Sequence, residues 1–207
     1  YRQSSNARPD LEERDPDNKL LARQDRLRLP AEFIRDAALA VSGLLHPKIG
    51  GPSVRPPQPP GVTELGYAGG TQWDESKGED AFRRGLYIHF QRTTPYPLLM
   101  NFDAPKGTVT VCRRDRSNTP LQALNLLNDP VFVEMAEACG RRMEVAGSLD
   151  QGVHRGFLLA MSREPSEAEA ARLKAYFEQE KQRAGEREAW TGLASVLLNL
   201  DEFITRE

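Results

Sequence analysis

The side chains of this protein that are best suited to chemistry gather in one stretch, CRRDRSNTPLQALNLLNDP, which covers residues 112–130. Five polar side chains lie just before a predicted helix start at Pro120, and the candidates for binding are Arg113, Arg114, Arg116, Asn118 and Thr119. Arginine presents planar, bidentate donors that suit carboxylate, sulfate or phosphate groups. A helix start adds free backbone N–H groups and the positive end of the helix dipole. The stretch therefore predicts an anion-binding corner.

Two further segments are expected to complete this corner. The glycine-rich run GGPSV at residues 50–54 would cover it, since glycine lets a ligand approach the backbone closely, and the candidate residues there are Gly50, Gly51 and Ser53. An ordinary turn is the alternative for this run. Asp103, in NFDAP, lacks the second carboxylate that glycosidase chemistry requires, so we expect it to cap a turn or to pair with one of the arginines.

A purely structural interpretation of the arginines stays open. In that interpretation they pair with Asp103, Asp115 and Glu134 and hold the loop to the rest of the domain. Exposed ion pairs of this kind contribute little stability on their own, whereas truncating a buried one is costly. Alanine substitutions would therefore separate the two interpretations, because one predicts a loss of ligand binding and the other a loss of stability.

Composition limits the classes of protein to consider. The 207 residues suit one domain with a single core, so we predict a single domain over residues 1–207. The chain has 28 Lys and Arg against 30 Asp and Glu, a net charge of -2, which does not favour nucleic acid as a partner. An apolar run of about 18 residues is missing, so direct membrane insertion is not expected.

The sequence also predicts that the chain holds neither metal nor cofactor. Its three histidines, His46, His89 and His154, lie on separate segments without ligand spacing. Its two cysteines, Cys112 and Cys139, do not form the Cys-x-x-Cys-His motif of covalent haem attachment. We expect Cys139 to be a buried thiol on a helix, and a bridge between the two cysteines is the minority alternative.

Helices are predicted to position these residues. One begins near Pro30 and ends at Gly43, and in the second half residues 120–200 carry at least four helices, with capping signals at Thr119 and Ser166. Asn128, Asp129 and Pro130 predict a tight corner between two of them. Apolar spacing predicts the buried faces to include Phe33, Leu121, Leu124, Leu127, Val131, Phe132, Met135, Cys139, Leu158, Trp190, Leu193 and Leu197. The fold class is therefore mainly α, a helical bundle.

A long Pro- and Gly-rich insertion interrupts this pattern at residues 46–79. Loops of this length inside a domain are uncommon and are usually functional or disordered. Scattered apolar residues suggest that the insertion packs onto the domain, namely Val54, Val62, Leu65, Tyr67 and Trp73. The following LYIHFQ alternates in polarity, which indicates a short strand, with a helical turn as the alternative.

Several long motifs resemble one known family. FRRGLYIHFQRT, NFDAP and RRDRSNTPLQALNLLNDPVFVEMA are similar to the uncharacterised C-terminal domain of planctomycete cytochrome-c-domain proteins, as are IGGPSV and LLNLDEF. The resemblance covers the whole chain and implies that it is the C-terminal portion of a larger family domain whose N-terminal part is missing here. It also implies an exported, periplasmic or cell-surface, multidomain parent with haem-carrying and helical domains as partners.

These observations lead to one functional hypothesis and one alternative. We expect a non-haem helical module of an exported, redox-associated protein, binding either a partner domain or an anionic ligand such as an anionic glycan through its loop region. The alternative is a polysaccharide-acting hydrolase with Asp103 and the arginines in its site. An enzyme needs two ionisable groups that converge in one pocket, whereas a docking module needs an exposed apolar or charged face.

Overall fold

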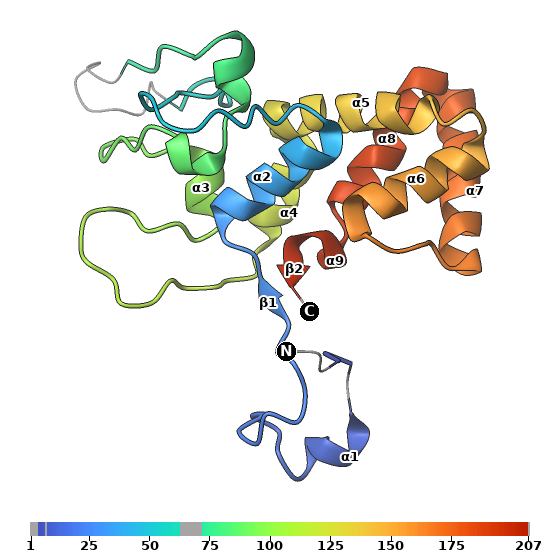
Figure 1. Cartoon of the computed structure of the whole chain (residues 1–207), viewed down its shortest axis with the longest axis horizontal. Helices are drawn as coiled ribbons and strands as arrows, with labels where there is room; N and C mark the ends of the chain where they lie inside the picture. The colour runs from blue at the N-terminus through green and yellow to red at the C-terminus, as the bar shows by residue number, and fades with distance from the viewer. Residues whose placement is uncertain (1–3, 7, 63–71, 207) are drawn as a thin grey trace.

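The chain is mainly α-helical, which confirms the predicted fold class. The computed structural model describes residues 4–6, 8–62 and 72–206. The second half holds the helices α4 (Pro120–Asn128), α5 (Pro130–Glu144), α6 (Leu149–Met161), α7 (Glu167–Ala184) and α8 (Glu186–Leu198). Figure 1 shows α5 to α8 gathered on one side of the molecule, while long loops from the segments before α4 occupy the other.

The first half contributes short elements and one long helix. Its elements are α1 (Pro9–Glu12), β1 (Leu27–Arg28), α2 (Ala31–Ser42), the 3-10 helices η3 (Gly78–Phe82) and η4 (Gly85–Tyr87), and α3 (Pro97–Asn101). The chain ends with α9 (Asp201–Ile204) and β2 (Thr205–Arg206). β1 pairs antiparallel with β2, with Leu27 opposite Arg206. Two residues are too few to show a period-2 pattern, so the sequence did not predict this pair.

Helix α2 begins and ends where its sequence predicts. Pro30 precedes its first residue, and Gly43 ends it in the left-handed region with a φ of 78°. Ile34 and Leu39 are fully buried. The prediction that Phe33 is also buried is wrong, since 54% of it is exposed. Adjacent residues on a helix point about 100° apart, and the core takes Ile34, which leaves Phe33 at the surface.

The predicted corner between α4 and α5 is confirmed. The Asp129 carboxylate accepts hydrogen bonds from the Val131 backbone N–H at 3.0 Å and from the Asn125 side chain at 2.9 Å. Pro130 is the first residue of α5. Because Asp129 is buried, its pKa is raised despite these bonds. A short polar side chain at the cap therefore sets the angle at which α5 enters the bundle.

Helices α5 and α8 lie at the centre of the hydrophobic core. The predicted inward residues of these two helices are buried, namely Val131, Phe132, Met135, Cys139, Trp190, Leu193 and Leu197. The Trp190 ring lies 4.7 Å from that of Phe177 on α7. Gly152 on α6 brings its backbone against the same indole. A single tryptophan therefore joins α6, α7 and α8.

Two buried faces were predicted incorrectly in the bundle. Leu121, Leu124 and Leu127 are each more than half exposed on α4, which instead buries Gln122, Asn125 and Leu126. Leu158 on α6 is also exposed. In α4 the inward side chains make polar contacts, described below. These contacts stabilise this orientation more than burial of the three leucines would stabilise the opposite one.

The insertion at residues 46–79 is irregular wherever it is described, apart from single bridging residues and the start of η3. It packs onto the domain as expected, because Val54 is buried and the Trp73 ring stacks on Tyr96 at 5.7 Å. Leu65 and Tyr67 lie outside the described residues. LYIHFQ is not a strand: η4 covers its start and only Ile88 bridges to Val54, so the alternative of a helical turn is correct.

The two cysteines are both free thiols. Cys139 is buried in α5, as predicted, and burial raises its pKa to about 11. Cys112 is exposed in the loop before α4. The minority alternative of a bridge between them is therefore wrong.

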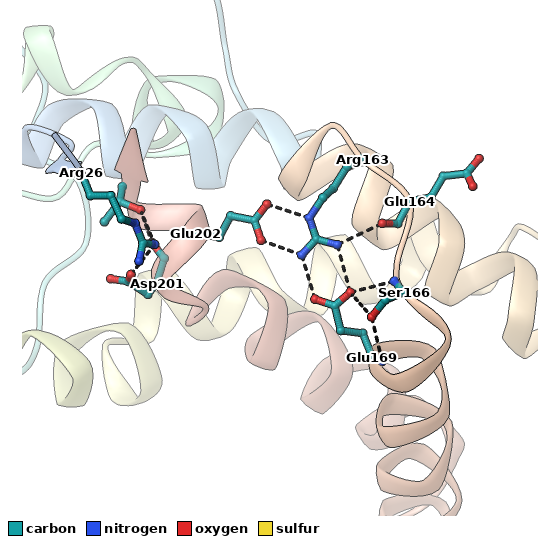
Figure 2. A network of polar contacts seen from close by, with 8 residues as sticks. Arg26, Arg163, Glu164, Ser166, Glu169, Asp201 and Glu202 are labelled. Atoms are coloured by element: carbon teal, nitrogen blue, oxygen red, sulfur yellow. Dashed lines mark hydrogen bonds and ion pairs between the residues drawn. The ribbon is translucent and has the colours of Figure 1, made fainter. Parts of the chain in front are cut away.

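Arg163 ties the end of α6 to two other helices, and Figure 2 shows this network. Its guanidinium donates to the Glu169 carboxylate on α7 at 2.7 and 3.0 Å and to the Glu202 carboxylate on α9 at 2.7 and 2.8 Å. Ser166 completes the predicted capping box, since its backbone N–H donates to Glu169 at 2.7 Å. The hydrogen bonds from Arg163 lower the pKa of Glu169 to about 2.

This network predicts a specific acid sensitivity. The pKa of Glu169 is lower in the folded chain than its usual 4.5, so the unfolded chain binds more protons between these values. The contribution of Glu169 to stability is therefore complete above about pH 4.5 and is lost as the pH falls toward 2. We expect the melting temperature of Glu169→Gln to fall less steeply with acid than that of the parent chain. Thermal scans from pH 6 to pH 2.5, with Glu178→Gln on the same helix as control, would show it.

Candidate functional site

The predicted arginines lie in an irregular loop, residues 104–116, which is here called the basic loop. Its two ends are held together by a polar clasp. Ser117 donates to the Asp103 carboxylate from its backbone N–H at 2.7 Å and from its hydroxyl at 2.8 Å. Asp103 itself adopts the left-handed region with a φ of 61°. Asp103 therefore closes the loop at its base, which agrees with the expected turn-capping role.

Gln122 anchors this clasp to the rest of the fold. Its Oε1 accepts from the Thr119 backbone N–H at 3.2 Å and from the Arg28 guanidinium. Its Nε2 donates to the Asn101 carbonyl at 2.8 Å and to the Ser117 hydroxyl at 3.2 Å. Only 2% of Gln122 is exposed. The side chain of Gln122, a residue of α4, thus caps the start of this helix. Fewer backbone N–H groups are left there for an external anion.

Arg114 is engaged within the chain. Its guanidinium donates to both oxygens of Glu32 on α2, at 2.8 and 3.0 Å. These hydrogen bonds raise the pKa of Arg114. The structural interpretation of the arginines therefore holds for Arg114, although its partner is Glu32 and not Asp103, Asp115 or Glu134.

Arg113, Arg116 and Asn118 remain exposed, and none of them has a side-chain hydrogen bond or an ion pair within the described part of the chain. Arg113 lines a cavity of about 310 Å³ together with Lys106, which is also unpaired there. The apolar wall of this cavity includes Met100, Pro105, Val109 and Val111. Arg116 lines a smaller hollow with Arg28, Asp103 and Asp115. The basic loop thus presents free cations next to apolar surface.

A second cavity, of about 330 Å³, shares Arg114 with the first. Phe33 and Leu86 supply its exposed apolar surface. Two ion pairs lie among its lining residues, Arg114 with Glu32 and Arg84 with Asp36, the latter at 3.1 Å. Because each charge in this cavity has a partner, it is less suited to an anion than the cavity at Arg113.

Residues 50–54 do not cover the arginines, so the predicted arrangement of Gly50, Gly51 and Ser53 over them is wrong. The cavities at Arg114 include none of these residues among their described lining. Figure 1 shows residues 50–54 (cyan) and the basic loop (yellow-green) apart, with α3 between them in this view. Ser53 lies instead near His89, with 3.4 Å between its hydroxyl and Nδ1.

The buried Arg83 explains this placement. Its guanidinium donates to the carbonyls of Pro52 at 2.9 Å, Lys48 at 3.3 Å and Gly50, and it stacks on the Tyr87 ring at 4.0 Å. Gly50 and Gly51 both have positive φ, 78° and 85°, which turns these carbonyls inward. Unpartnered donors of a buried cation are costly, and the glycine turn provides acceptors for both terminal nitrogens of this guanidinium.

Lys106, Glu32 and Arg83 were not predicted from the sequence. Gln122 was predicted as the partner of Thr119 in the helix cap, but its hydrogen bonds to Arg28, Asn101 and Ser117 were not. The hydrolase alternative gains no support from Asp103. Asp115 lines the same cavities, but both oxygens of Asp103 already accept from Ser117, which suits a structural carboxylate better than a proton donor.

In the described residues no group of three or more His, Cys, Asp or Glu is placed to hold a metal ion. Within the same residues no helix is long and apolar enough to cross a bilayer. His46 and His154 each lie near one glutamate, Glu79 at 3.6 Å and Glu164 at 4.0 Å.

A family model described as PSD1, protein of unknown function (DUF1553), matches residues 1–177. The match includes the basic loop and ends within α7, before α8 begins. No curated protein and no solved structure matches the chain. The description of this family names neither a reaction nor a ligand.

Proposed function

Because the chain belongs to this PSD1 family, whose function is unknown, we propose that it is a helical binding module that recognises an anionic ligand through the basic loop. One observation carries the proposal. Arg113 and Lys106 line one cavity, have no partner among the described residues, and stand beside an apolar wall that includes Val109 and Val111. Such a surface suits a ligand with carboxylate or sulfate groups on a larger scaffold.

The charge of the loop supports this ligand class. Residues 103–116 contain four basic and two acidic side chains, and Arg114 is neutralised by Glu32 outside the loop. Ion pairs at an exposed site contribute about 1 kcal/mol or less each, and at 0.1 M ionic strength salt largely screens attraction between charges more than about 10 Å apart. The expected binding is therefore weak for a single site and strongly dependent on salt.

The contacts around the loop prepare it for binding. The Asp103–Ser117 clasp closes its base, and the Arg114–Glu32 pair holds its C-terminal end against α2. A loop that is already held in place loses less conformational entropy when a ligand binds. Arg114 in this scheme positions its neighbour Arg113 and does not itself contact the ligand.

The wider setting is part of the same proposal and is supported by the family resemblance. The chain would belong to an exported, multidomain, redox-associated protein of planctomycete type, located in the periplasm or at the cell surface. The haem-carrying and helical domains of that parent would be its neighbours. The module itself would use no cofactor and no catalytic residue, and an anionic glycan is the ligand class to test first.

We expect Arg113→Ala to weaken binding of a sulfated oligosaccharide about three- to tenfold while leaving the melting temperature nearly unchanged, because Arg113 makes no intramolecular polar contact within the described residues. Titration calorimetry with sulfated dextran fragments at low salt would measure the change, with neutral dextran as the control ligand. Lys106→Ala should act in the same direction.

Arg155→Ala is the matched control protein, since Arg155 is an exposed arginine on α6, outside the basic loop. It should bind like the parent chain. Arg114→Ala should lower the melting temperature as well as binding, because it also frees the loop from Glu32. If the parent chain binds no sulfated or carboxylated ligand at low salt, or if Arg113→Ala and Arg155→Ala behave alike, the proposal is wrong.

A further inference from the structure

Two spaces of unequal size share a wall on the basic loop. One is the cavity of about 310 Å³ lined by Arg113 and Lys106, here called the Arg113 cavity. The other is a hollow of about 40 Å³ lined by Arg28 and Arg116, here called the Arg116 hollow. Three residues line both spaces, namely Asp103, Arg114 and Asp115. Each space thus has two cations of its own beside a common wall.

The Arg116 hollow holds donors that the fold leaves unused. Arg116 makes no side-chain hydrogen bond or ion pair with any described residue. Arg28 donates from Nη1 to Gln122, while its Nε and Nη2 have no partner in the described part of the chain. A hollow of about 40 Å³ has room for the oxygens of one acidic group but not for a sugar ring. It is therefore suited to the end of a charged substituent.

The common wall carries one free carboxylate. Asp103 already accepts hydrogen bonds from Ser117, and Arg114 is paired across the wall's edge with α2. Asp115 is exposed and has no hydrogen-bond or ion-pair partner among the described residues. A carboxylate repels a negative group placed against it, whereas a hydroxyl group can donate to it. The wall thus disfavours negative charge between the two spaces and accepts a neutral donor there.

We propose that the basic loop recognises two acidic groups of one oligosaccharide, one in the Arg113 cavity and one in the Arg116 hollow, with a ligand hydroxyl donating to Asp115 between them. This inference rests on the proposed function and adds to it the spacing of the charges and a residue that determines specificity. Arg113 and Arg116 are three residues apart, so their Cα atoms lie at most about 11 Å from each other. Acidic groups on different sugar units of one chain can reach both spaces. The charges of phosphate or pyrophosphate lie closer together and would stand against Asp115.

Two contacts on one ligand reinforce each other. An exposed ion pair contributes little alone, but once the first acidic group is bound, the second binds from a high effective concentration. The clasp between Asp103 and Ser117 keeps the two spaces next to each other before the ligand arrives. The affinity should therefore depend on how many acidic groups the ligand carries and on their separation.

Calorimetric titration of the whole chain at low salt would compare two forms of tetragalacturonate. One form has all four carboxylates free, and the other has one free carboxylate with the rest as methyl esters. We expect the first form to bind about thirtyfold more tightly, whereas a single site would give only about fourfold, because any of the carboxylates can occupy it. Arg116→Ala should reduce the difference to this fourfold and leave binding of the mono-acid form nearly unchanged. Arg155→Ala is again the control protein.

Asp115→Asn tests the wall. We expect it to strengthen binding of pyrophosphate about three- to tenfold, because the repelling charge is gone, while an asparagine oxygen still accepts from a ligand hydroxyl. Tetragalacturonate should gain less, so the preference of the chain for the oligosaccharide should shrink. Asp74→Asn is the matched control, since Asp74 is also exposed and lies outside the basic loop.

The outcomes separate this inference from the proposed function. If neither form of tetragalacturonate binds at low salt, both fail. If both forms bind, Arg113→Ala weakens both, and they differ by no more than about fourfold in the parent chain, anion binding stands and recognition of two groups is wrong. Equal effects of Asp115→Asn and Asp74→Asn on pyrophosphate binding would overturn the role of Asp115.

Discussion

Arg83→Ala is expected to lower the free energy of unfolding by about 3 kcal/mol and to loosen residues 48–54. Arg83 is almost completely buried, and it donates to three carbonyl groups of that segment. Hydrogen bonds to a charged group contribute more than neutral ones, and acceptors left unsatisfied cost further free energy. The stacking of the guanidinium on Tyr87 is lost at the same time. Urea denaturation followed by circular dichroism would measure the difference.

Arg92→Ala is the matched control for this prediction. Arg92 is exposed and makes no hydrogen bond or ion pair within the described residues, so its removal should change stability by less than about 0.5 kcal/mol. Hydrogen exchange should show faster exchange at residues 48–54 in Arg83→Ala and unchanged exchange in α5. Equal stability of the two variants would contradict the role assigned to Arg83.

Gly152→Val should destabilise the helical half by about 3 kcal/mol. A Cβ at Gly152 would lie 2.4 Å from Trp190 Cη2, 2.7 Å from Trp190 Cζ3 and 3.0 Å from the Met143 carbonyl oxygen. The indole cannot move aside easily, because it packs against Phe177 inside the core. Helix α6 must therefore shift away from α8, and tight packing is lost along its length.

A double-mutant cycle would test the cause. In Gly152→Val combined with Trp190→Leu, the smaller side chain makes room for the new methyl groups, so the loss should be less than the sum of the two single losses by at least about 1 kcal/mol. Thermal and urea unfolding of the four proteins would give this coupling. Additive losses would mean that the overlap with Trp190 is not what Gly152 avoids.

The arginines of the basic loop show how much of a charged site can be predicted from sequence. Arg113, Arg114 and Arg116 lie within four residues, so the cluster itself was visible in the sequence. Which arginine stays free depends on Glu32, which lies 82 residues away from Arg114 and meets it only because α2 packs beside the basic loop. The free pair, Arg113 with Lys106, could not be selected before that contact was known. The same holds for Arg83, whose acceptors lie about thirty residues earlier in the chain.

The sequence by itself determined the long helices of the second half, α2, and several of their ends. The caps at Thr119, Asp129 and Ser166 depend on contacts within four residues, and such contacts form wherever the local chain is helical. The single-domain prediction over residues 1–207 stays a prediction. The inward faces of α5 and α8 also followed from spacing, because these helices are surrounded by other helices and bury every apolar residue of one stripe.

Only the tertiary structure decided which side of α4 faces inward. Apolar spacing favours burial of Leu121, Leu124 and Leu127, but Gln122 finds partners on segments as far as 94 residues away, and those bonds hold the polar side against the core. The orientation of a helix depends on the contacts made by both of its faces. Polar contacts with distant segments form only when the chain is folded, so they are not visible in the local sequence. The exposed leucines of α4 and the free cations of the basic loop are both consequences of contacts between distant segments.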